Sequence, residues 1–225
     1  MSEVYRELLG KNSIYYANMP EDRQINAVSC NNKNDSLIIT YAGGLHYNRW
    51  KTLSMLGKAI HNYNNNHTKK VRLNIYSQKT PDKEILDSLS ISDSCSFMGS
   101  LTSEQVNDVL LQSDLVVHVE SFDEEDIEAT RLSFSTKIYE YMASGKPLLA
   151  IGPQGIASIE YLQDCSFCVT NISDITDSLV ERIANKRERE LIVNKCAEKY
   201  TLISKSEHSK DRVIRAIMEC NKDDV

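Results

Sequence analysis

A regular alternation of short apolar segments with amphipathic ones, starting at Ser36, constrains the fold of this chain more than any other feature of its sequence. Six of these segments have the length and apolar content of buried β-strands. They lie at residues 37–41, 71–76, 94–98, 115–119, 148–151 and 166–170. Because helical segments separate them, consecutive strands are expected to pair in parallel through right-handed crossovers. The sequence therefore predicts an α/β fold, a doubly wound, parallel, six-stranded Rossmann-like sheet with strand order 3-2-1-4-5-6.

The helical segments carry their own start and packing signals. Thr102 and Gln105 form the capping-box pattern that begins a helix. Trp50, Leu53 and Ile60 recur at helical spacing on an earlier segment. We expect helices at 48–62, from about 81, at 102–112, from about 136, and at 156–162, 173–185, 187–201 and 208–220.

The first 35 residues do not follow this alternation. Residues 3–10 have the pattern of a short helix and residues 13–16 that of a strand, and a polar, asparagine-rich run follows. Such a run is typical of a linker. We therefore interpret residues 1–35 as the end of a preceding domain with a linker. Residues 36–225 are predicted to form one Rossmann-like domain with C-terminal helices.

Composition and charge exclude several classes of protein. The net charge is −6 and lysine and arginine are scattered, whereas nucleic-acid binding needs a basic face, so no nucleic-acid partner is predicted. No apolar run approaches the roughly 20 residues that a membrane-spanning helix needs. The N-terminus lacks the apolar core of a signal peptide, and we expect a cytoplasmic protein.

The cysteines do not indicate a disulfide scaffold or a metal site. Six are present, too few for a disulfide scaffold of this length, and most have apolar neighbours. The Cys165-Ser-Phe-Cys168 sequence is half of a zinc or redox motif. Because there is no second such pair and no paired histidine, a structural role is favoured and no metal site is predicted.

The predicted strand order places its switch point between the first and fourth strands. Ligands of open α/β sheets bind there, outside the carboxyl ends of the strands. Gly43 and Gly44 follow the first strand, opposite the loop after Val119. Glycine lets the backbone approach a ligand closely, and Arg49 at the start of the next helix can hold a diphosphate. A tight turn with an exposed Arg49 is the alternative interpretation.

The loop after the fourth strand leads into a helix with two different faces. Its expected N-cap is Ser135, and Gly145, followed by a proline, ends it. Lys137 and Glu140 lie on the side opposite the apolar residues. Lys137 sits in the first turn, where unpaired amides favour anions, which indicates an anionic ligand. An exposed Lys137–Glu140 ion pair is the alternative.

Two stretches together, GGL…R at 43–49 and SFSTKIYEYMASGKPLLA at 133–150, resemble the C-terminal, donor-binding domain of retaining GT-B glycosyltransferases of the glycosyl transferases group 1 type. In that family a G-R-L…K-G stretch follows the first strand of the domain. An E-x7-E element, with Phe-Gly in its middle, leads into L-E-A-M-A-x-G-x-P. Residues 132–140 fit this element without a gap, and Asp114 and Ser121 match residues flanking the fourth strand. The resemblance covers about Ser36 to the C-terminus and implies one half of a GT-B fold, with residues 36–225 as a nucleotide-sugar-binding domain.

The resemblance also implies roles for individual residues. Glu140 is similar to the glutamate that holds the ribose hydroxyls, and Arg49 stands where the family has a phosphate-binding lysine. The backbone from Phe134 to Lys137 is expected to face the diphosphate and the sugar, and residues beside Gly99 are expected to contact the base. The predicted site consists of Gly43, Gly44, Arg49, Gly99, Phe134, Ser135, Thr136, Lys137 and Glu140.

The chain departs from the family pattern at two positions. Gly44 stands where the family has its first arginine, so one phosphate-binding cation is absent unless Lys137 replaces it. Leu132 replaces the first glutamate, which touches the sugar. The acidic run at 123–128 offers a substitute carboxylate, but a solvated, mobile loop is favoured there. His46 lies in the loop that contains Gly43 and Gly44, here called the glycine loop, and His118 lies within a strand. Neither is assigned a catalytic role.

The activity implied by the resemblance is metal-independent, retaining transfer from a nucleoside-diphosphate sugar to a carbohydrate or lipid-linked acceptor. Arg49 and Lys137 would assist departure of the diphosphate, and no cofactor or metal is expected. The acceptor half would come from a missing N-terminal domain or a partner subunit, so the chain alone is expected to be inactive. The full enzyme would act in polysaccharide biosynthesis. Peripheral association of the full enzyme with a membrane is compatible with this activity.

Two other functions are compatible with the same fold. One is a non-catalytic nucleotide-binding or regulatory Rossmann-like module that has lost transfer. The other is a GT-B sugar-nucleotide epimerase, although its sequence elements differ from residues 133–147. Donor hydrolysis or transfer by a longer protein would separate the enzyme from the module.

Overall fold

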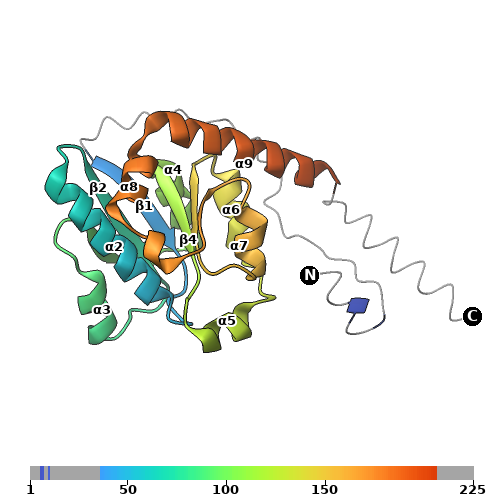
Figure 1. Cartoon of the computed structure of the whole chain (residues 1–225), viewed down its shortest axis with the longest axis horizontal. Helices are drawn as coiled ribbons and strands as arrows, with labels where there is room; N and C mark the ends of the chain where they lie inside the picture. The colour runs from blue at the N-terminus through green and yellow to red at the C-terminus, as the bar shows by residue number, and fades with distance from the viewer. Residues whose placement is uncertain (1–5, 8–9, 11–35, 207–225) are drawn as a thin grey trace, which may run out of the picture.

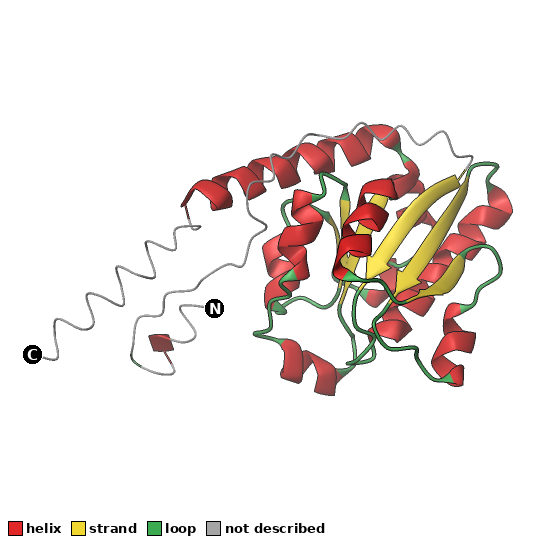
Figure 2. Cartoon of the chain, turned by 180° about the vertical axis from the view of Figure 1, so that it is seen from behind, coloured by secondary structure: helices red, strands yellow, loops and turns green. Residues whose placement is uncertain are grey.

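The computed structural model describes residues 6–7, 10 and 36–206, in which six parallel strands form one sheet. The strand order is β3-β2-β1-β4-β5-β6, which confirms the order predicted from the sequence. Helices lie on both faces of the sheet (Figures 1 and 2). The strands are β1 (Ser36–Ala42), β2 (Lys70–Tyr76), β3 (Cys95–Gly99), β4 (Leu115–Val119), β5 (Leu148–Ile151) and β6 (Phe167–Val169).

The helices between the strands also follow the predicted pattern, with differences mainly at their ends. They are α2 (Arg49–Asn66), α3 (Lys83–Leu89), α4 (Ser103–Gln112), α5 (Glu124–Thr130), α6 (Lys137–Ala143), α7 (Ala157–Leu162), the 3-10 turn η1 (Ile172–Asp174), α8 (Asp177–Ala184) and α9 (Lys186–Ser206). The capping box of Thr102 and Gln105 is present at the start of α4. The elements expected at 13–16 and 208–220, and most of the helix expected at 3–10, lie outside the described residues.

Two apolar clusters hold the helices against the sheet, one on each face. The strands contribute alternate residues to the two clusters: Leu115 and Val117 of β4 belong to one, and Val116 belongs to the other. The first cluster packs under α2, α3 and α8, and the second under α4, α6, α7 and α9. All five residues of β4 are buried, as expected of a central parallel strand covered on both faces. In the described part of the chain, no helix is both long and apolar enough to cross a membrane.

A side-chain hydrogen-bond pair fixes α6 to the end of β1. The Tyr141 hydroxyl donates to the Ala42 carbonyl at 2.9 Å and accepts from the Ala42 amide at 3.2 Å. Tyr141 is buried, so these bonds also satisfy backbone groups that water does not reach. The contact brings the polar side of α6 next to the glycine loop that follows β1.

The expected N-cap of α6 is wrong by one residue. The helix begins at Lys137 and its N-cap is Thr136, which has helical dihedrals and makes no side-chain cap hydrogen bond. Ser135 instead contributes its carbonyl, which accepts from the Ile138 amide at 3.1 Å. The chain is therefore already turning at Ser135. The predicted end is confirmed, because Gly145 adopts a φ of 67° just after the helix.

The acidic run expected to be a solvated loop is largely a helix, α5. Glu124, Glu125 and Asp126 occupy its first turn, where negative charge is favourable. Asp126 also accepts from the Asn48 side-chain amide at 3.0 Å, and Asp123 pairs with Lys51 at 2.5 Å. The expected loop is wrong, because Asn48 and Lys51 at the start of α2, distant in sequence, pair with this acidic segment. The expected solvation is confirmed for Glu124, Glu125 and Glu128, which are exposed.

Replacing Tyr141 with phenylalanine tests the contact between α6 and β1. Tyr141→Phe leaves the buried amide and carbonyl of Ala42 without the hydroxyl, so the free energy of unfolding should fall by about 1–3 kcal/mol. Urea denaturation of both proteins measures the change. The control is Tyr47→Phe, since Tyr47 is 46% exposed and should change stability little. Equal stability of Tyr141→Phe and the unmodified chain would contradict the anchoring role.

Candidate functional site

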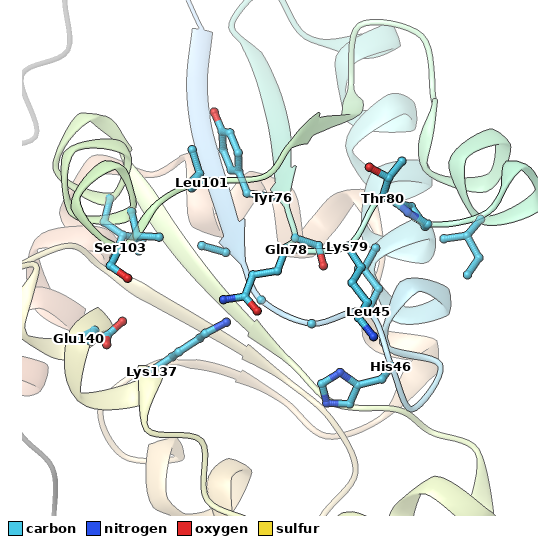
Figure 3. A pocket seen from close by; sticks show the side chains of 18 of the residues that line it. Leu45, His46, Tyr76, Gln78, Lys79, Thr80, Leu101, Ser103, Lys137 and Glu140 are labelled. Carbon is cyan, nitrogen blue, oxygen red and sulfur yellow. The ribbon is translucent and has the colours of Figure 1, made fainter.

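A cavity of about 860 Å³ opens at the carboxyl ends of β1 and β2. This is the edge of the sheet that the switch-point rule indicated, but residues 120–123, directly after β4, do not line the cavity. Its walls are the loop after β1, the loop after β2, one side of α4 and the first turn of α6. Figure 3 shows side chains from these elements directed into the same space. The fold thus brings together four segments that are far apart in the sequence.

The structure places some of the predicted site residues in the cavity wall and others outside it. Gly43, Gly44, Lys137 and Glu140 line the cavity. Outside its lining lie Arg49, Gly99, Phe134, Ser135 and Thr136.

The two glycines of the loop after β1 lie against aromatic side chains. A β-carbon on Gly43 would lie 2.6 Å from the Tyr41 ring, whose hydroxyl donates to the Gly44 carbonyl at 2.6 Å. A β-carbon on Gly44 would lie 2.4 Å from the His46 ring. The space of a side chain at position 44 is therefore partly occupied by His46, which itself lines the cavity.

Arg49 is held by a buried carboxylate. Its Nε and Nη2 donate to Glu120 Oε2 at 2.9 and 2.8 Å. The Arg49 side chain is 13% exposed and the Glu120 side chain 2%. The charge of the arginine is thus compensated within the protein. Direct contact between Arg49 and a phosphate remains a prediction.

Glu120 is the centre of a polar cluster at the end of β4. Its second carboxylate oxygen, Oε1, accepts from the Ser158 hydroxyl at 3.2 Å and lies 3.1 Å from His118 Nε2. The Thr52 hydroxyl donates to the Glu120 carbonyl at 2.9 Å. Burial favours the protonated acid, but contacts with His118 and Arg49 outweigh it and hold the pKa of Glu120 below its ordinary value.

The contact between Arg49 and His46 fixes the protonation of the imidazole. Arg49 Nη1 lies 2.9 Å from His46 Nε2. Because a guanidinium only donates hydrogen bonds, Nε2 must accept, and the ring is neutral with its proton on Nδ1. Desolvation and the positive charge of Arg49 lower the pKa of His46, in agreement with this assignment. His46 therefore brings a neutral ring to the cavity.

Lys137 and Glu140 project from α6 into the cavity without forming an ion pair with each other in the described structure. In Figure 3 the ammonium end of Lys137 points towards the side-chain amide of Gln78. Partial burial lowers the pKa of Lys137, and Arg49 lowers it further, while Glu140 opposes both. An anion placed beside Lys137 would relieve this cost. The exposed ion pair considered from the sequence is not formed.

The predicted residues outside the cavity wall have structural contacts of their own. Phe134 packs against Tyr139 and Tyr161, with ring centroids 5.4 and 4.9 Å apart. Gly99 has a φ of 99°, and its carbonyl accepts from the Ser77 amide at 3.0 Å. Gly99 thus fixes the start of the loop after β2, which does line the cavity.

Sequence reasoning missed Glu120, Gln78 and Lys79. Gln78 and Lys79 line the cavity from the loop after β2, and Glu120 holds Arg49. A signal existed for all three, because each lies within three residues of the carboxyl end of a predicted strand. For Glu120 that signal was weak, since an acidic residue beside an acidic run gives no indication of burial.

The family model of glycosyl transferases group 1 matches residues 36–185, about two thirds of the chain. No curated protein matches the chain by sequence.

Solved structures with the same fold include two trehalose-phosphate synthases and TarM. The alpha,alpha-trehalose-phosphate synthase (UDP-forming) of Burkholderia vietnamiensis aligns with a TM-score of 0.60 and 10% identity, over 85% of this chain and 46% of that one. A mutant of S. aureus TarM, in complex with fondaparinux, alpha-GlcNAc-glycerol and UDP, aligns with a TM-score of 0.59 and 15% identity, over 93% and 38%. The alpha,alpha-trehalose 6-phosphate synthase of Burkholderia multivorans gives 0.58 and 12%, over 84% and 44%.

At these identities the likeness shows the fold alone, and it is the fold predicted from the sequence. The chain forms a Rossmann-like sheet that corresponds to one half of a GT-B fold. It spans less than half the length of each of these three structures.

Replacing Glu120 with glutamine tests the buried carboxylate. Glu120→Gln leaves the Arg49 guanidinium without its counter-charge, and at neutral pH the free energy of unfolding should fall by about 3 kcal/mol. The loss should shrink in acid. Because the folded pKa of Glu120 is lowered, its stabilising effect is complete above the ordinary glutamate pKa and disappears as pH falls through the folded value.

Urea denaturation of the unmodified chain and the variant, from about pH 6 to about pH 3, measures both effects. Glu128→Gln is the matched control, because Glu128 is exposed on α5. A stability difference that stays constant over this pH range would contradict an ionised, buried Glu120.

Proposed function

Because the chain belongs to the glycosyl transferases group 1 family, we propose that it is the donor-binding half of a glycosyltransferase. It binds a nucleoside-diphosphate sugar in the cavity at the carboxyl ends of β1 and β2. The observation that carries the proposal is that Lys137 and Glu140, one turn apart on α6, both line this cavity. One offers a cation for a phosphate and the other a carboxylate for ribose hydroxyls.

The nucleotide class is supported by the fold neighbours. The Burkholderia vietnamiensis synthase is described as UDP-forming, and the S. aureus TarM structure contains UDP. The cavity of about 860 Å³ lies within the usual range for small-molecule sites. Its walls carry apolar and polar side chains in similar numbers, which suits a base and ribose followed by charged phosphates.

In this proposal each group acts on a different part of the donor. The Glu140 carboxylate accepts hydrogen bonds from the two ribose hydroxyls, and Lys137 neutralises charge on the diphosphate as the sugar leaves. The transfer proceeds with retention and without a metal ion. Arg49 contributes through His46, whose Nε2 accepts its hydrogen bond at the cavity rim.

The acceptor side of the reaction lies on another domain or a partner subunit. The chain spans 38–46% of the three solved structures compared above, and a GT-B enzyme reacts in a cleft between two halves. A carbohydrate or lipid-linked acceptor in polysaccharide biosynthesis fits this arrangement.

A non-catalytic nucleotide-binding module is the second candidate. Two observations favour it: Leu132 replaces the glutamate of the family pattern, and the charge of Arg49 is compensated by Glu120. Both reduce the groups available to stabilise a departing diphosphate. Sugar transfer by a longer protein containing this chain separates the two candidates.

The 225-residue chain should bind a nucleoside diphosphate in the presence of a metal chelator. Glu140→Gln removes the charge that receives the ribose hydroxyls, and Lys137→Met removes a cation, so each should weaken binding by about tenfold or more. Neither should change stability much, because the two side chains form no ion pair with each other. Calorimetry with UDP, GDP and ADP measures affinity, and Glu128→Gln serves as the control. Unchanged affinity of Glu140→Gln would refute the ribose assignment.

The same chain should transfer no sugar by itself, because only one wall of the reaction cleft is present and positioning supplies much of the rate. Incubation with radiolabelled sugar nucleotides and candidate acceptors measures transfer. Addition of an upstream or partner domain should restore it, and efficient turnover by residues 1–225 would disprove the half-enzyme proposal.

A further inference from the structure

The charges around the cavity are distributed differently from what the sequence pattern indicates. The loop after β1 contributes no free cation to the described site: Gly44 has no side chain, and Arg49 is compensated by Glu120. The lysines that line the cavity are Lys79 and Lys137, and no arginine lines it. The cations that bind a ligand with two phosphate groups must therefore come from segments other than the loop after β1.

The two lysines lie in different parts of the cavity wall. Figure 3 shows Glu140 on one side, Lys137 and Gln78 in the middle, and Lys79 extending towards His46 on the other side. If Glu140 holds the ribose, the first phosphate lies at Lys137. The next group along the ligand then reaches the space between Lys79 and His46.

The neutral state of His46 leaves Lys79 as the cation on that side. His46 Nε2 accepts from Arg49, so a phosphate approaching the ring meets a neutral donor at Nδ1 rather than a positive charge. Among the described residues that line the cavity there, only Lys79 carries a full positive charge. A terminal phosphate needs such a partner when it leaves water.

The loop that carries Lys79 is anchored at both ends while the lysine itself stays exposed. The Ser77 amide donates to the Gly99 carbonyl at 3.0 Å, and the Asp82 side chain accepts from the Ile85 amide at 3.1 Å. Asp82 is thereby used as the N-cap of α3. The backbone is fixed at both ends of the loop, whereas the Lys79 side chain forms no ion pair within the described structure.

We propose that Lys79 binds the phosphate farther from the ribose, while Lys137 binds the nearer one. This inference rests on the proposed function, because it assumes a nucleoside diphosphate with its ribose at Glu140. It assigns part of the site to the loop after β2, which the family motifs do not include. Lys79 would then set the preference for a diphosphate over a monophosphate.

The test compares mono- and diphosphates of one base on the full 225-residue chain. Calorimetry with the pairs UMP and UDP, GMP and GDP, and AMP and ADP first identifies the pair that the unmodified chain binds best. Lys79→Met should then reduce diphosphate affinity about tenfold and leave monophosphate affinity unchanged. Lys137→Met should weaken both. Lys79→Arg should retain the preference for the diphosphate.

Lys83→Met is the matched control, because Lys83 is exposed at the start of α3 and does not line the cavity. Unchanged diphosphate affinity in Lys79→Met would overturn this inference alone, as would an equal loss for both nucleotides. No binding of any nucleotide by the unmodified chain would overturn the proposed function, and this inference with it.

Discussion

The contact between Glu120 and Arg49 joins the two halves of the sheet at the switch point between β1 and β4. Glu120 directly follows β4 and Arg49 begins α2, and the two residues are 71 positions apart in the sequence. Ser158 of α7 donates to the same carboxylate. A charge buried to this degree requires a partner of opposite sign, so the geometry around it is strongly restricted. The loop after β1, which forms one wall of the cavity, ends at Arg49, the residue that Glu120 holds in place.

This restriction also determines what the site has to offer a ligand. The charge of Arg49 is compensated by Glu120, and Arg49 Nη1 donates to His46, whose ring lies where a side chain at Gly44 would need room. The glycine loop thus becomes a packed, nearly neutral wall. Positive charge enters the cavity from α6 through Lys137 and from the loop after β2 through Lys79. The family's charge pattern is redistributed over other elements of the same fold.

The family pattern and the structure agree best at α6. Tyr141 anchors this helix to Ala42 at the end of β1, and its polar side then faces the cavity with Lys137 and Glu140. The spacing of apolar residues was sufficient to predict that polar side. The packing of Phe134 among Tyr139 and Tyr161 was not predictable in the same way. An aromatic residue in a binding motif and one in a core have the same local sequence pattern.

The sequence by itself determined the strand order, the positions of nearly all described helices, the capping box of α4 and the edge of the sheet at which the cavity opens. These follow from periodicity, local turn chemistry and the handedness of crossovers, all of which act over short stretches of chain. Only the tertiary structure decided that residues 124–130 form a helix, that Arg49 faces Glu120, and that Lys79 lines the cavity. Each of these depends on which distant side chain lies opposite, because burial and charge pairing are set by the assembled fold rather than by neighbours in sequence.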